Sequence, residues 1–291
     1  MTVELIAQAV VSGLLMGMIY ALVAAGLSLI FGLMDVVNFA HGELLMLAMF
    51  ATLILYQYSG LDPILLLPLV ALLLFGFGMA IYRLLIGRAL SVTFNRGMSQ
   101  IFVTFGLAIF LRGAAQYLFG SEFQSLTGTW VSDRTVNLAG IYLPLPQLVA
   151  SVVCLLAFAA LLAVSRTEFG RALEATREDR DAVALIGIDR DRIFAIGWGM
   201  GAAAVGVAGA MLATFYYVSP NVGVNFATIA YVTVALGGFG SLLGSLVAGL
   251  LVGLAESLTA LVLEPSVKQI GMFALYMFVL AFRPRGLFGK L

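Results

Sequence analysis

Long apolar stretches alternate with short polar segments along almost the whole of the 291-residue chain. A bilayer core about 30 Å thick needs about 20 apolar residues, because a helix rises 1.5 Å per residue. The candidate spans are residues 5–33, 43–58, 63–85, 98–119, 145–164, 193–218, 226–240, 243–263 and 268–282. This pattern predicts an all-α fold, a polytopic bundle of about eight or nine transmembrane helices forming one domain over residues 1–291.

Two segments interrupt the helical pattern. The span at 226–240 is short and ends in Gly237, Gly238 and Gly240, and a polar break runs from Asp35 to Glu43. Non-helical backbone at membrane depth is tolerated only where protein or a cavity covers it. We therefore expect broken or re-entrant helices here, and the choice between eight and nine spans depends on them.

The composition makes lipid the solvent for much of the chain. Hydrophobic residues make up 62% and charged residues 10% of the sequence, whereas about 25% of the residues in soluble domains are charged. The net charge of zero argues against a nucleic-acid partner. The single cysteine, Cys154, excludes an internal disulfide, and with one histidine no His/Cys cluster exists to hold a metal.

Basic residues are gathered in three segments, and their positions predict the orientation. Twelve of the 15 lie around 86–97, in 165–192 and in the C-terminal tail: Arg83, Arg88, Arg96, Arg166, Arg171, Arg177, Arg180, Arg190, Arg192, Arg283, Arg285 and Lys290. Because cytoplasmic loops are enriched in Lys and Arg, these segments are expected in the cytoplasm. The long 120–144 loop, with Arg134 alone, is expected outside. Nine spans place the N-terminus outside, and eight place it inside.

Segment 165–192 differs from an ordinary loop. Residues 171–186 lack Gly and Pro and are rich in Ala, Leu, Glu and Arg, which favours helix. Their apolar positions form two clusters separated by the charged run 177–181, so we expect two short helices outside the membrane, with Gly187 suited to a helix C-terminus. A solvated loop is the plainer interpretation, but a docking surface for a soluble partner explains the interspersed apolar residues.

Glycine pairs four residues apart recur in the spans, and one tetrapeptide is repeated. The pairs are Gly13/Gly17, Gly197/Gly201, Gly240/Gly244 and Gly249/Gly253. Such pairs let helix backbones approach closely in lipid, and we favour ordinary packing over a gating hinge. Val-Asn-Phe-Ala occurs at 37–40 and at 224–227. Inverted repeats are common in transporters, but one match of this length is expected by chance and is only a hint.

Four motifs together resemble a known family. Asp181-Ala182-Val183 followed by Gly187 resembles the Glu-Ala-Ala-x-x-x-Gly coupling motif of ABC importer permeases, with Asp for Glu and Val for the second Ala. The other stretches are Asn-Phe-Ala-His-Gly-Glu at 38–43, Gly-Gly-Phe-Gly-Ser-Leu-Leu-Gly at 237–244 and Arg-Pro-Arg-Gly-Leu-Phe-Gly at 283–289. In this order they resemble the permeases of branched-chain amino acid ABC uptake systems, most of all the shorter of the two permease types. The resemblance covers essentially the whole chain.

This resemblance implies an ABC importer permease fold in the bacterial inner membrane. It implies a second related permease, two cytoplasmic ATP-binding subunits and a periplasmic or external solute-binding protein. The coupling residues implied within 165–192 are Leu173, Glu174, Ala175, Asp181, Ala182, Val183 and Gly187. Independently, the sequence has no G-x-x-x-x-G-K-[ST] phosphate loop, so we expect ATP to bind to partner subunits and this chain to need no cofactor and to be no enzyme.

Ionisable residues at membrane depth are costly and mark candidate functional groups. Arg112, Glu256 and Glu43 qualify. One interpretation is that Arg112 and Glu256 pair to lock the bundle; the other is that one of them contacts a zwitterionic substrate. Asn38, His41 and Glu43 suit gating or backbone support in a helix break, and His41 fits a structural role equally well. With Gly237, Gly238 and Gly240, these residues are the candidates for the translocation path or gating.

The substrate and the energy source leave alternatives. Branched-chain or related hydrophobic amino acids are the first expectation, but similar permeases serve urea, short amides and aromatic acids. An ion-coupled secondary transporter is a second class of hypothesis, supported by Asp35, Glu43 and Glu256, and it assigns no role to 165–192. An intramembrane enzyme is disfavoured, because no His/Asp/Ser constellation appears within the spans.

Overall fold

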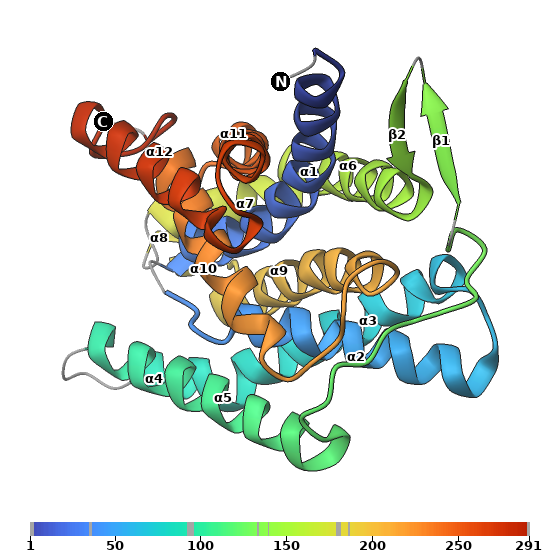
Figure 1. Ribbon diagram of the computed structural model, residues 1–291. Coiled ribbons are helices and arrows are strands. Elements are labelled where there is room, and N and C mark those ends of the chain that lie inside the picture. Colours follow the sequence, from blue (N-terminus) through green and yellow to red (C-terminus); the bar gives the residue numbers. More distant parts are fainter. Residues whose placement is uncertain are drawn as a thin grey trace.

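The computed structural model describes residues 3–34, 37–91, 96–132, 134–138, 140–178, 182–185 and 187–289. Within these residues, eight helical stretches are long and apolar enough to cross a membrane. They contain α1 (Val3–Met34), α2 (His41–Ser59), α3 (Pro63–Ile81), α5 (Arg96–Phe119), α6 (Leu145–Ser165), α9 (Arg190–Leu212), α11 (Leu242–Val262) and α12 (Gln269–Phe282) (Figure 1). The predicted polytopic all-α bundle is confirmed.

The other elements are short. The π-helix η1 (Tyr82–Ile86) and α4 (Gly87–Ser91) prolong α3; α7 (Glu168–Glu178) and α8 (Ala182–Leu185) join α6 to α9; α10 (Val222–Gly237) is a short apolar helix; and the 3₁₀ turn η2 (Pro265–Val267) precedes α12. Strands β1 (Thr135–Leu138) and β2 (Ile141–Pro144) form an antiparallel hairpin with Thr135 opposite Pro144. This hairpin was not predicted from the sequence, although a β-branched and aromatic run interrupted by a glycine is a hairpin signal.

Apolar side chains cover the outer surface of the bundle as well as its core. On α5, Phe102, Phe110 and Leu118 are each about two-thirds exposed (70%, 68% and 67%). A helix that is apolar on all sides suits an environment where one side packs against protein and the other against lipid. The core, by contrast, is centred on α1, α2 and α9.

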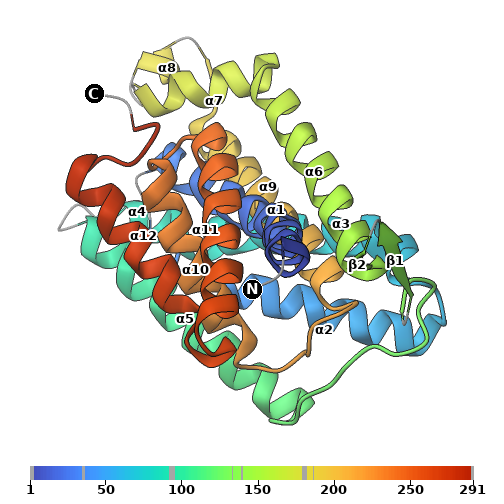
Figure 2. The ribbon, with the colours of Figure 1, turned by 45° about the horizontal axis from the view of Figure 1, so that its top comes forward.

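The two ends of the bundle carry different elements. At one end, which we call the hairpin face, the Gln8 side chain donates to the Tyr142 carbonyl (2.6 Å) and accepts from the Tyr142 N–H (2.8 Å), which fixes the start of α1 to β2. The other end, the coupling face, carries α7, α8 and the C-terminal tail at 283–289. Figure 2 shows the C-terminus beside α7 and α8, and the hairpin at the far end of α6.

Helix α10 connects the two faces. It follows residues 213–221. This segment is joined to the loop after α5 by two backbone hydrogen bonds: Gln124 N–H donates to the Val218 carbonyl (2.9 Å), and Val218 N–H donates to the Gln124 carbonyl (2.7 Å). Helix α10 ends beside the C-terminal tail, where Leu287 N–H donates to the Leu236 carbonyl. The 16 residues of α10 form about 24 Å of helix. The non-helical segment 213–221 that leads into α10 is covered by protein, since Val218 and Ser219 are fully buried. Among the described residues, α10 thus reaches the coupling face beside the eight helices that are long and apolar enough to cross a membrane.

This arrangement corrects the bounds of two predicted spans. The span expected to run to 218 ends at Leu212, because the apolar residues after it form the buried approach to α10. The short span expected at 226–240 is α10, four residues earlier at its start and three at its end.

The bundle is an inverted repeat in which α1, α2, α3 and α5 correspond to α9, α10, α11 and α12. Its contacts come in matched pairs: α1 with α11 and α3 with α9 are the most extensive, and α2–α9 matches α1–α10. Corresponding helices run in opposite directions between the two faces. Gly26 and Gly201 approach each other reciprocally, and so do Gly42 and Gly223.

Candidate functional site

The 165–192 segment forms the two short helices that its sequence predicts. Helix α7 begins at Glu168, three residues before the expected start, and Thr167 Oγ1 accepts from Gly170 N–H at its first turn (3.4 Å). Thr176 is buried and Leu173 packs against the core of the bundle, while Glu174 and Arg177 are exposed residues on the same helix. Leu173 and Thr176 therefore set α7 against the bundle.

Helix α8 carries the residues of the coupling motif. Val183 is buried, its carbonyl accepts from Ile188 N–H (3.1 Å), and Gly187 has the left-handed backbone (φ 81°) expected after a helix end. Ala182 opens α8 and Ala175 lies on α7, whereas Asp181 lies outside the described residues. Sequence analysis did not single out Leu185, which is 89% exposed on α8. The sequence feature that could have identified Leu185 is an apolar residue in a predicted helix that lies outside the membrane spans.

Two stretches singled out far apart in the sequence lie together at the coupling face. They are the α10–α11 turn at 237–241 and the C-terminal tail at 283–289. The Phe288 N–H donates to the Gly237 carbonyl (3.0 Å), and a side chain on Gly238 would meet the Gly289 backbone N at 2.5 Å. Gly238 and Gly240 both have positive φ (99° and 78°), which favours glycine. The shape of the turn therefore requires glycine at both positions, and the tail packs directly against it.

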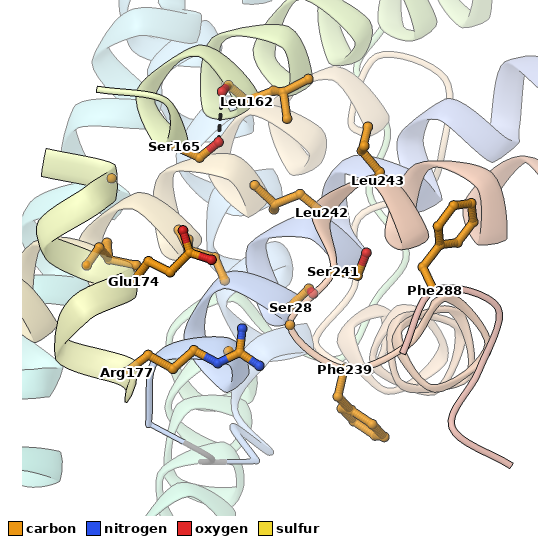
Figure 3. Close-up of a pocket in the computed structure, with 15 residues that line it drawn as sticks. Ser28, Leu162, Ser165, Glu174, Arg177, Phe239, Ser241, Leu242, Leu243 and Phe288 are labelled. Atoms are coloured by element: carbon orange, nitrogen blue, oxygen red, sulfur yellow. Dashed lines mark hydrogen bonds between the residues drawn. The ribbon is translucent and has the colours of Figure 1, made fainter. Parts of the chain in front are cut away.

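A cavity of about 300 Å³ joins this turn to α7 (Figure 3). The cavity is lined by the coupling-face ends of α1 and α6, by α7, by the α10–α11 turn with the start of α11, and by the C-terminal tail. The Arg177 side chain reaches from α7 to the turn, since a Cβ on Gly240 would lie 3.2 Å from its Nη2 atom. The coupling segment is thus in contact with both halves of the repeat.

The helix break before α2 is covered by protein groups, as the sequence predicts for such a break. The Tyr231 hydroxyl donates to the Asn38 carbonyl (2.6 Å), Asn38 Oδ1 accepts from Ala40 N–H (3.1 Å), and Thr104 Oγ1 donates to the Val37 carbonyl (3.2 Å). His41 donates through Nε2 to the Val23 carbonyl of α1 (2.9 Å). Asn38 and His41 are both fully buried, and these hydrogen bonds tie the break to α1 through His41, to α5 through Val37 and to α10 through Asn38.

Glu43 pairs with Arg112, whereas one interpretation of the sequence paired Arg112 with Glu256. The guanidinium of Arg112 donates to Glu43 Oε1 through Nη2 and through Nε (3.1 Å for Nε). The expected Arg112–Glu256 pair is wrong, because α5 packs beside α2 and not beside α11. The Glu43 side chain is 3% exposed, whereas that of Arg112 is 33% exposed.

Glu256 is held near the hairpin face by two other groups. The Tyr20 hydroxyl donates to its Oε2 atom (2.7 Å), and Lys268 Nζ lies 3.4 Å from the same oxygen. Lys268 follows η2, in the connection to α12, and so folds back over the end of α11. Tyr20 and Lys268 also line a second cavity, of about 290 Å³, together with Tyr216 and Asn225.

Both carboxylates keep one oxygen that can accept a further hydrogen bond. Glu43 Oε2 and Glu256 Oε1 are buried and have no hydrogen-bond partner among the residues that the structure describes. A buried acceptor of this kind suits an ammonium group or a water on a polar path.

Comparison with known proteins covers nearly the whole bundle. The family described as branched-chain amino acid transport system / permease component matches residues 9–281. The high-affinity branched-chain amino acid transport system permease protein BraD of Pseudomonas aeruginosa is 33% identical, over 97% of this chain and 95% of its own length. The corresponding protein LivH of Escherichia coli is 28% identical, over the same shares. Protein LivM of Escherichia coli is 28% identical over 93% of this chain and 68% of its own length. No solved structure matches the chain.

Proposed function

Because this chain belongs to the family of permease components of branched-chain amino acid transport systems, we propose that it moves branched-chain or related hydrophobic amino acids inward across a bacterial inner membrane. The observation that carries the proposal is the family match over residues 9–281, which includes both halves of the repeat and the coupling segment between them. The chain is a transport subunit. ATP is bound and hydrolysed on separate cytoplasmic subunits.

The docking surface for one ATP-binding subunit is α7 with α8. Both helices lie outside the spans, between α6 and α9, and Leu185 exposes 89% of its surface there. Leu185 lies within the stretch that resembles the coupling motif, and we therefore assign it to the docking surface. We assign the predicted coupling residues to this docking segment: Leu173, Glu174, Ala175, Asp181, Ala182, Val183 and Gly187.

Movement of α7 reaches the membrane part through the coupling face. Arg177 reaches the α10–α11 turn, and α7 also contacts α1, α6 and α9. Closure of the ATPase pair on ATP shifts α7, and the two halves of the repeat exchange between outward-open and inward-open states. Gly237, Gly238 and Gly240 form the hinge of this motion. Asn38 and His41 stabilise the break before α2, while Glu43, Arg112 and Glu256 are the polar groups of the path.

The remaining partners follow from the family and from the two faces. The Escherichia coli relatives LivH and LivM are named as permeases of the same kind of system, which supports pairing with a second related permease. An external solute-binding protein docks at the hairpin face. The coupling face and the C-terminus are cytoplasmic, because that face carries the basic segments.

Docking is tested by replacing Leu185 with Ser. We expect the Leu185→Ser variant to insert normally and to lose most of the ATP-binding subunit during purification of the complex from native membranes. Leu61→Ser is the matched control: it is an exposed leucine, 49% exposed, in the α2–α3 connection. The measurement is the amount of ATP-binding subunit recovered per permease. Equal recovery with both variants would remove α8 from the docking surface.

A further inference from the structure

We propose that the cavity beneath α7 is a second binding site for the transported class of molecule, an amino acid with an apolar side chain, taken up from the cytoplasm after release. The inference rests on the proposed function for the identity of the ligand. Bound there, the amino acid ties α7 to the α10–α11 turn and slows further import. The site is distinct from the polar groups at Glu43 and Glu256.

One corner of the cavity, between α11 and Arg177, has the groups that bind a carboxylate. Leu242 and Leu243 open α11 and line the cavity, and as the first residues of a helix they have amides without a partner within that helix. Arg177 brings its guanidinium to the same turn, beside Gly240. A helix N-terminus and a guanidinium together favour a carboxylate, because both offer N–H donors and positive charge.

A buried hydroxyl in the same wall points to a ligand independently. Ser28 lines the cavity from α1, is 1% exposed, and its Oγ atom has no hydrogen-bond partner among the described residues. A buried hydroxyl without a partner costs free energy, so it is normally matched by a water or a ligand. Figure 3 shows Arg177 pointing toward Ser28, with Ser241 next to it.

The rest of the lining sets the ligand class. Leucines and phenylalanines form most of the wall: Leu162, Leu173, Leu242, Leu243, Phe239 and Phe288. The volume of about 300 Å³ is at the lower end for small-molecule pockets, which are about 300–1,000 Å³. The Glu174 carboxylate lines the same cavity, three residues before Arg177 on α7, and attracts an ammonium group. An apolar amino acid matches this combination of a cation, an anion and an apolar wall.

Binding is tested on the detergent-purified complex of all membrane and ATP-binding subunits, without the external binding protein. Radiolabelled leucine is the probe, with 4-methyl-2-oxopentanoate as a competitor that lacks the ammonium group. We expect saturable leucine binding that Arg177→Gln weakens about tenfold or more, because a hydrogen bond to a charged group is lost. Arg171→Gln is the matched control on the same helix; Arg171 lies outside the lining of this cavity and pairs with Glu168 across 3.8 Å. The keto acid is expected to compete weakly.

Leu242→Trp provides a second variant that fills the cavity without removing charge, and it is expected to abolish the same binding. Leucine binding unchanged in both Arg177→Gln and Leu242→Trp would overturn the proposal. So would occupation of the site by an anionic phospholipid, detected by native mass spectrometry, in a complex that binds no leucine.

The regulatory consequence is tested in proteoliposomes with ATP inside and the binding protein outside. We expect millimolar leucine inside to reduce the initial uptake rate several-fold in the wild-type complex and in Arg171→Gln, and to have little effect on whatever uptake Leu242→Trp retains. Equal inhibition of the wild type, Arg171→Gln and Leu242→Trp would show that leucine does not inhibit uptake through this cavity. Absence of ATP-driven uptake in the wild type would contradict the proposed function instead, while leucine binding in detergent still reports on this site.

Discussion

Glu43 and Glu256 are buried within the bundle, and each carboxylate is held by a basic residue from a distant part of the chain. Glu43 on α2 takes Arg112 from α5, and Glu256 on α11 takes Lys268 from the connection to α12. Hydropathy alone identified Glu43, Arg112 and Glu256 as costly residues at membrane depth. It did not identify their partners, because pairing depends on which helices pack together, and Lys268 read only as the edge of a span.

The Glu43–Arg112 pair leads to a prediction about stability. Arg112→Gln leaves a nearly fully buried carboxylate without its cation, which is strongly destabilising. Because Arg112 is itself one-third exposed, we expect a loss of about 1–3 kcal/mol, seen as a melting temperature several degrees lower in detergent.

The double variant Glu43→Gln with Arg112→Gln is the control for this prediction. It removes the unpaired charge, so it is expected to recover part of the lost stability. A double variant at least as unstable as Arg112→Gln alone would show that the pair is not what stabilises this region.

At the scale of elements, hydropathy located the spans because a membrane-spanning helix needs a long apolar run. It placed the end of α9 too late and missed the hairpin, since the buried approach to α10 is as apolar as a span and a four-residue strand leaves a weak signal. The recurring glycine pairs were expected to allow close helix packing. On α1 and α11 they do: a Cβ on Gly13 would lie 2.9 Å from the Gly253 carbonyl oxygen.

This packing leads to a prediction for Gly17. A Cβ added there would lie 2.8 Å from the Gly249 carbonyl oxygen and 2.9 Å from the Leu250 Cα atom, both parts of the backbone of α11. Gly17→Ala therefore forces α1 and α11 apart, and we expect it to lower the free energy of unfolding by about 1–3 kcal/mol.

Gly106→Ala is the matched control, since a Cβ at Gly106 on α5 meets nothing within 4 Å. Alanine is the better helix former by about 0.5–1 kcal/mol, so this variant should be as stable as the wild type or slightly more so. Thermal unfolding of the two variants in detergent checks the comparison. Equal melting temperatures would mean that α1 and α11 are not packed this closely.

For the whole molecule, the order of four motifs was enough to identify the family, and the family match over residues 9–281 confirms it. The inverted repeat was not visible in the sequence, because the two halves share helix directions and contacts but not residues. The coupling face was only partly predictable: each motif was found in the sequence, but which motifs meet in space depends on how the helices pack.

The central claim is that ATP hydrolysed on other subunits drives inward movement of branched-chain amino acids through this permease. The measurement that tests it most directly is uptake of radiolabelled leucine into proteoliposomes that contain the complete complex, with the solute-binding protein outside and ATP inside. We predict accumulation that requires ATP and is competed by isoleucine and valine, but not by urea, a short amide or an aromatic acid. Accumulation by this chain alone, driven by an ion gradient without ATP, would contradict the account.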